Sequence, residues 1–132
     1  MSQENVELVR RALEAYNLGD FDAMQAMNHP DVALDWSRSR GFEARVYRGS
    51  DEVMRFYRDF LGTFDEAVVV PERCIEAGDS VVVPNSFHLR GRDGIETSAR
   101  SAIVFRIEDG LIAEICLYQT LADASEAAGL SE

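Results

Sequence analysis

The spacing of the apolar residues changes once along the chain, close to Gly62, from a helical period to a strand period. Before that point apolar side chains recur every three or four residues, as in Val6, Val9 and Leu13, which is typical of helices that bury one face. After it apolar and polar residues alternate over long runs, which is typical of strands. Helices followed by long strands predict an α+β fold, with the helices on one face of a curved sheet.

The individual elements follow from this periodicity and from capping and turn residues. We expect a helix over residues 5–18, a short helix capped by Asp20 and closed by the His29-Pro30 pair, and a third helix capped by Ser50. Strands are predicted over residues 32–37, 67–77, 80–90, 96–107 and 111–121, the last four joined by glycine-containing hairpin turns. A last short helix is predicted over residues 123–128.

Length and charge limit the classes of function. The 132 residues predict a single domain, 1–132. The net charge of −11 argues against a surface for nucleic acid or anionic membranes, because both need basic side chains. The start of the chain shows no signal peptide, and no run is long enough to span a membrane. Cys74 and Cys116 are expected to be free thiols in a reducing cytoplasm, and no metal or cofactor is expected.

Alternation assigns the strand residues to two faces. The more apolar face of each long strand is predicted to line the interior, and it includes Phe87, Ile103, Ala113, Ile115 and Leu117. Three polar residues, Asn85, Ser101 and Gln119, fall on this inner face. The outer face carries His88, Arg100, Arg106, Glu114 and Tyr118, which we interpret as a cross-strand charge ladder. A mostly apolar interior with a few polar groups is typical of a small-molecule site.

Six segments resemble a known family in their order and spacing. They are NLGDFDAM at 17–24, HPDV at 29–32, YRG at 47–49, LRGR at 89–92, FRIEDGLI at 105–112 and YQTLADASEAAGL at 118–130. Together they resemble the SnoaL-like polyketide cyclase group of the nuclear-transport-factor-2-like (ketosteroid isomerase-like) superfamily over essentially the whole chain. The resemblance implies a conical, curved antiparallel β-sheet wrapped around the N-terminal helices, the cystatin-like α+β barrel, with a deep cavity. It also implies a homodimer through the outer sheet face, where Val82, Pro84, Ala102, Val104 and Cys116 would supply the apolar contact.

Despite the resemblance, we do not expect this chain to use the ketosteroid isomerase mechanism. The three catalytic positions of that enzyme correspond here to Ala12, Trp36 and Ile103, none of which can exchange a proton. The same correspondence points Trp36 into the cavity and Asp35 outward, toward Arg38 or Arg40. An aromatic wall, rather than a carboxylate base, is therefore expected at this point of the interior.

Three functions remain open. The leading hypothesis is a small-molecule binding protein whose ligand is mainly apolar, such as a polyketide or terpenoid. The alternative is a cofactor-free isomerase, cyclase or hydrolase, with Tyr16, Tyr57 and Asn85 as the candidate catalytic residues. A dimerisation or interaction module is the third. The predicted ligand-binding residues are Tyr16, Trp36, Tyr57, Phe60, Asn85, Phe87, Ser101, Leu117 and Gln119.

Overall fold

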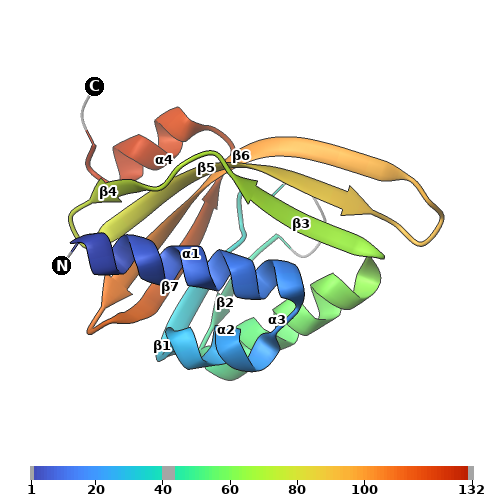
Figure 1. The fold of residues 1–132 in the computed structure, drawn as a ribbon, viewed down its shortest axis with the longest axis horizontal. Helices are drawn as coiled ribbons and strands as arrows, with labels where there is room; N and C mark the ends of the chain where they lie inside the picture. The colour runs from blue at the N-terminus through green and yellow to red at the C-terminus, as the bar shows by residue number, and fades with distance from the viewer. Residues whose placement is uncertain (1, 40–43, 131–132) are drawn as a thin grey trace.

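The computed structural model describes residues 2–39 and 44–130, and within them it has four helices and a curved seven-stranded sheet (Figure 1). The α+β class is as predicted. None of the helices in these residues is long and apolar enough to cross a membrane. In chain order the elements are α1 (Ser2–Leu18), α2 (Phe21–Met27), β1 (Asn28–Asp35), β2 (Val46–Arg48), α3 (Ser50–Thr63), β3 (Glu66–Pro71), β4 (Ile75–Ala77), β5 (Ser80–Arg90), β6 (Glu96–Glu108), β7 (Leu111–Tyr118) and α4 (Leu121–Ala127).

The sheet is mixed, which corrects the prediction of an antiparallel one. Its strand order is β2-β1-β7-β6-β5-β3, with β4 paired to β5. β1 runs parallel to β7, with Leu34 opposite Ile115, whereas the other pairs are antiparallel. The hairpin turns force the neighbours β5, β6 and β7 to be antiparallel. No hairpin joins β1 to β7, so nothing in the local sequence fixes their relative direction.

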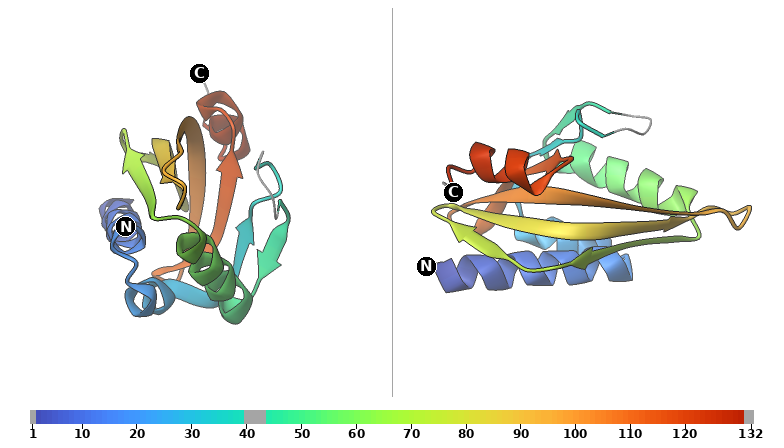
Figure 2. Two further views of the ribbon diagram at one scale, coloured as in Figure 1. Left: turned by 90° about the vertical axis from the view of Figure 1, so that its right-hand side faces the viewer. Right: turned by 90° about the horizontal axis from the view of Figure 1, so that it is seen from above.

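The helices lie on two sides of the sheet. α1, α2 and α3 pack on the inner face and form the main core with it, whereas α4 lies on the outer face, on the opposite side of β5 and β6 from α1 (Figure 2). There Ala124 of α4 packs against Val82 and Ala102, which are fully buried. Part of the apolar patch expected to form a dimer is therefore covered within one chain, and the homodimer stays a prediction. Arg106 Nε lies 3.6 Å from Glu114 Oε1, one rung of the expected charge ladder.

Several element boundaries differ from the prediction. β1 begins at Asn28 and runs through His29 and Pro30, which the sequence indicated as a helix stop and a turn. The predicted strand 67–77 is divided into β3 and β4, which pair with different parts of β5. The prediction that Ser50 caps the third helix was wrong, because Ser50 is the first residue of α3. The cap position is Gly49, whose φ of 88° favours glycine, and no side chain caps the helix. Thr120 caps α4 by accepting a hydrogen bond from the Asp123 backbone N–H.

An irregularity in the pairing of β6 with β7 changes which β7 residue faces the core. Arg106 pairs with Glu114, but the next residue, Ile107, pairs with Ile112. The extra β7 residue at this bulge reverses the alternation toward the start of the strand. Ile112 therefore belongs to the inner core in place of Ala113, which strict alternation had placed there.

The Asn17 side chain of α1 holds the outermost strand of the sheet. Its amide nitrogen donates to the Val69 carbonyl at 2.8 Å, and its amide oxygen accepts from the Val69 backbone N–H at 2.9 Å. Both backbone groups of Val69 are thus paired on the side of β3 away from β5, where residues 2–39 and 44–130 provide no further strand. An edge strand with paired backbone groups is less able to recruit another chain.

Replacement of Asn17 by Ala removes both hydrogen bonds and should lower the free energy of unfolding by about 1–3 kcal/mol. Urea denaturation of the variant and the wild type measures the difference. Gln25→Ala, at an exposed position of α2, is the control and should change stability by less than about 0.5 kcal/mol. Equal stabilities of Asn17→Ala and wild type would contradict a role for Asn17 in holding β3.

Candidate ligand-binding pocket

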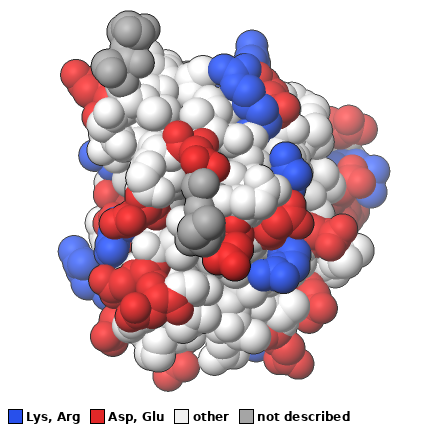
Figure 3. Space-filling view, turned by 60° about the vertical axis from the view of Figure 1, so that its left-hand side comes forward, with Lys and Arg blue, Asp and Glu red and all other residues white. Residues whose placement is uncertain are grey.

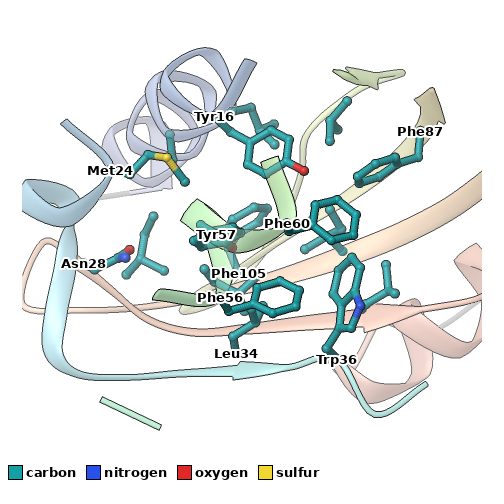
Figure 4. A pocket seen from close by; sticks show the side chains of 17 residues that line it. Tyr16, Met24, Asn28, Leu34, Trp36, Phe56, Tyr57, Phe60, Phe87 and Phe105 are labelled. Atoms are coloured by element: carbon teal, nitrogen blue, oxygen red, sulfur yellow. The ribbon is translucent and has the colours of Figure 1, made fainter. Parts of the chain in front are cut away.

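The inner pocket lies between the three N-terminal helices and the inner face of the sheet (Figure 4). Its free volume is about 50 Å³, which is enough for a small chemical group but not for a whole ring system. Most of its wall is apolar. The lining residues are Ala12, Leu13, Tyr16, Met24, Asn28, Leu34, Trp36, Phe56, Tyr57, Phe60, Val69, Phe87, Ile103, Phe105, Ile112, Ile115 and Leu117.

The outer pocket adjoins the inner one and is much larger, with a free volume of about 600 Å³. The two share four lining residues, Trp36, Phe60, Phe87 and Leu117. The outer pocket is formed where β5 and β6 extend beyond the core, and its other lining residues are Ser39, Phe64, Leu89, Thr97, Ala99, Arg100, Ser101 and Gln119. The two pockets are therefore adjacent, with these four residues at their border.

Aromatic side chains form a wall at the border of the two pockets. This aromatic wall consists of Trp36, Phe60 and Phe87, which line both pockets, and of Phe56, which lines the inner one. Phe56 and Phe60 lie one helical turn apart and stack with ring centroids 5.6 Å apart. The Trp36 ring lies 5.5 Å from Phe56 and 5.9 Å from Phe60, and Phe87 of β5 lies 6.1 Å from Phe60. Such edge and tilted contacts stabilise aromatic clusters beyond the burial of their area. The wall offers flat apolar surfaces to a planar ligand.

Asp35 and Trp36 point in opposite directions, as predicted. Trp36 lines both pockets, whereas Asp35 accepts hydrogen bonds from the Ser37 N–H and hydroxyl and from Arg38 Nη1 at 3.1 Å. Of the two arginines considered for this ion pair, Arg38 forms it, and Arg40 lies outside the described residues. Burial alone would raise the pKa of Asp35, but the hydrogen bonds from Ser37 and the Arg38 charge outweigh it and lower that pKa.

Two phenols face the inner pocket without a hydrogen-bond partner. The rings of Tyr16 and Tyr57 lie edge to face, 5.7 Å apart, and neither hydroxyl bonds to another of the described residues. Burial raises the pKa of both phenols above the ordinary value of 10, and the neighbouring Tyr57 adds to the effect at Tyr16. Both therefore stay neutral at physiological pH and can donate a hydrogen bond to a bound molecule.

Charged groups are scarce in the wall of the pocket and abundant outside it. No carboxylate or imidazole occurs among the lining residues of the two pockets. The one charged lining residue, Arg100, is largely exposed and lies 2.6 Å from Glu72. On the face shown in Figure 3, Asp and Glu side chains are spread over the surface with Arg between them. In residues 2–39 and 44–130, no group of three His, Cys, Asp or Glu is placed to hold a metal ion.

Eight of the nine predicted ligand-binding residues line one or both pockets. Asn85 is the exception and is fully buried in β5. Its amide nitrogen donates to the Val83 carbonyl at 2.9 Å, and its oxygen accepts from the Ser101 hydroxyl at 3.1 Å. The structure thus brings two of the candidate catalytic residues, Tyr16 and Tyr57, into the inner pocket and leaves Asn85 out. Whether these residues bind a ligand stays a prediction.

The sequence did not indicate several lining residues, of which Asn28 is the one with a polar side chain in the inner pocket. The other missed residues of this pocket are apolar, and Met24 and Phe56 come from expected apolar helix faces. The predicted second helix closed at the His29-Pro30 pair, and Asn28 just before that pair was given no role. The signal that could have found it is the apolar run that follows, because a strand that begins at Asn28 places Asn28, Val32 and Leu34 in buried positions.

The chain belongs to the SnoaL-like domain family, whose model matches residues 9–115. No curated protein sequence matches it. Among solved structures it is similar to an NTF2-like protein of unknown function from Burkholderia pseudomallei, with 23% identity, a TM-score of 0.78 and coverage of 96% of this chain and 98% of that one. It is also similar to TerC co-crystallised with polyporic acid, with 16% identity, a TM-score of 0.78 and coverage of 95% and 98%.

A third similar structure is a protein assigned as a polyketide cyclase from Xanthomonas campestris, with 21% identity, a TM-score of 0.74 and coverage of 97% and 98%. At these levels of identity the likeness establishes the fold alone. The NTF2-like, cystatin-like architecture predicted from the sequence motifs is therefore shown for this chain.

The lowered pKa of Asp35 predicts a pH dependence of stability. Because the carboxylate is favoured in the folded state, its contribution is present above the unfolded pKa, near the ordinary value of 3.8, and is lost as the pH falls through the lower folded pKa. Asp35→Asn should therefore lower the free energy of unfolding at neutral pH. From neutral to acidic pH, the free energy of unfolding should fall less in this variant than in the wild type. Urea denaturation at several pH values measures both effects. Parallel pH profiles of the variant and the wild type would contradict the assignment.

The unpartnered phenols predict an unusual mutational result. When a buried tyrosine donates a hydrogen bond to another protein group, its replacement by Phe lowers the free energy of unfolding by about 1 kcal/mol. Because neither hydroxyl here has a protein partner, Tyr16→Phe and Tyr57→Phe should keep or raise the free energy of unfolding. Chemical denaturation measures this. The control is Ser101→Ala, which removes the hydrogen bond to Asn85 and should be destabilising.

Proposed function

We propose that this protein binds a mainly apolar, uncharged small molecule in the two adjoining pockets. The observation that carries the proposal is the aromatic wall shared by the pockets, because Trp36, Phe60 and Phe87 present ring surfaces to both. Burial of a planar apolar molecule against these rings is favourable in proportion to the apolar area removed from water. The larger outer pocket holds the body of the molecule, and the narrow inner pocket holds one end of it.

The neighbours support a ligand of the polyketide type, whereas the terpenoid alternative rests on the apolar pocket wall alone. The match to the SnoaL-like model covers most of the chain, and one structural neighbour was co-crystallised with polyporic acid. Another neighbour is assigned as a polyketide cyclase. These are properties of other proteins, and they guide the choice of compounds in which to look for the ligand.

The pocket chemistry favours binding over acid–base catalysis. A general base needs a pKa near the working pH, but the pKa values of Tyr16 and Tyr57 lie above the ordinary value for a phenol. As a cofactor-free isomerase, cyclase or hydrolase, the protein would orient a carbonyl group through these two phenols and take its base from the substrate or from water. As an interaction module, it would not use the pocket at all.

Mass spectrometry of denatured protein tests the proposal directly, because a bound molecule is released and identified. A thermal-shift screen against polyketides and terpenoids is the second measurement. A co-purified apolar compound, or stabilisation by members of the panel, is the expected result. No co-purified compound together with no thermal shift across the panel would overturn the proposal.

Leu117→Phe should reduce ligand binding, because Leu117 lines both pockets and a larger side chain narrows the passage between them. We expect the thermal shift caused by a panel compound to fall by half or more while the far-UV circular dichroism stays unchanged. Leu18→Phe is the matched control, since Leu18 is 76% exposed and lines neither pocket. Equal loss of the shift in both variants would show that the effect does not arise from the pocket.

A further inference from the structure

Asn28 lies in the wall of the inner pocket and is the first residue of β1, directly after α2. Its backbone N–H donates to the Gln25 carbonyl and so ends α2, and in the sheet the residue is paired with Ile112 of β7. The side chain takes no part in either role. It points from the start of β1 toward the other lining residues (Figure 4). With 8% of its surface exposed, it is one of two buried polar residues in the described chain.

The protein leaves the Asn28 amide almost unpaired. Its nitrogen lies 4.0 Å from the Met54 sulfur, a weak acceptor, and its oxygen has no hydrogen-bond partner among the described residues. In those residues every fully enclosed side-chain nitrogen or oxygen has a partner. The amide oxygen therefore borders the open space of the pocket. The other buried polar residue, Asn85, differs because both atoms of its amide are bonded.

We expect an almost unpaired amide at this position to oppose folding. Met54 of α3 and Ile112 of β7 lie next to Asn28, and a leucine of about the same size would pack against them without an unpaired polar group. Asn28 should therefore contribute less to stability than the paired Asn85. Polar groups that weaken the fold in this way are typical of sites where a protein recognises a ligand.

The surroundings define what the amide can bind. No charged side chain lines the inner pocket, so nothing there would compensate a buried charge on the ligand. The net charge of −11 also disfavours an anion. An amide both donates and accepts, which suits a neutral hydroxyl or carbonyl oxygen. The free volume of about 50 Å³ admits such a group at the end of a larger molecule.

We propose that Asn28 is a specificity-determining residue, whose amide hydrogen-bonds to an uncharged oxygen group at the leading end of the ligand. This proposal rests on the proposed function, because it needs a molecule to enter through the outer pocket. The aromatic wall positions the body of that molecule, and Asn28 selects for the oxygen group. An analogue that carries a methyl group in place of the oxygen would leave the amide unpaired.

The test compares two probes that differ only in this group, 2-naphthol and 2-methylnaphthalene. Their dissociation constants are measured by equilibrium dialysis at neutral pH with wild type, Asn28→Leu and, as a matched control, Met24→Leu, which changes an apolar neighbour in the same wall. We expect Asn28→Leu to lower the preference for 2-naphthol by about fivefold, the value of one hydrogen bond. Met24→Leu should leave the preference unchanged. Asn28→Leu should also raise the urea midpoint of unfolding.

The other outcomes distinguish a failure of the role of Asn28 from a failure of the proposed ligand-binding function. If both probes bind wild type and Asn28→Leu leaves their ratio unchanged, Asn28 does not select the ligand, and the proposed function stands. Tyr16→Phe and Tyr57→Phe are measured in the same way. If the preference for 2-naphthol falls only in one of these two variants, a phenol and not Asn28 binds the ligand oxygen, and the role of Asn28 is overturned. If neither probe binds wild type, both proposals fail for compounds of this class. Asn28→Ala serves as the second variant should Asn28→Leu fold poorly.

Discussion

The packing of the α3 aromatic residues against Trp36 connects the helices with the end of β1 at the pocket. Trp36 follows β1 directly, and its backbone N–H is held by the Arg45 carbonyl at 2.9 Å. Its ring meets Phe56 and Phe60 at 5.5 and 5.9 Å. Trp36, Phe56 and Phe60 thus form the part of the inner pocket wall where α3 meets the sheet.

Much of this architecture could be predicted from the sequence, because it depends on local periodicity. The change of period near Gly62 separates helices from strands, and strand phase turns Trp36 inward and Asp35 outward. The same reasoning placed Phe87, Ser101 and Leu117 in the pocket wall. Each of these residues lies in a regular element, in which the orientation of a side chain follows from its neighbours in sequence.

The features that escaped prediction depend on contacts between distant segments. The parallel pairing of β1 with β7 joins residues about 80 positions apart, and the bulge that turns Ile112 inward is visible only in the β6–β7 register. Asn85 has the predicted strand phase, yet its amide bonds to Ser101 and Val83 and lies outside the pocket wall. Asn28 was missed because β1 begins immediately after α2, and no turn residue between them marks the start of the strand.

The polar groups of the inner pocket share one property that limits its chemistry. Tyr16, Tyr57 and Asn28 are all neutral at physiological pH, and all lack a strong partner among the described residues. Such groups hold oxygen atoms in place at little electrostatic cost, but they cannot remove a proton from carbon. A reaction in this pocket would therefore depend on the acidity of the ligand itself. Under the function proposed above, the wall would select a molecule by its shape and by the position of its oxygen atoms.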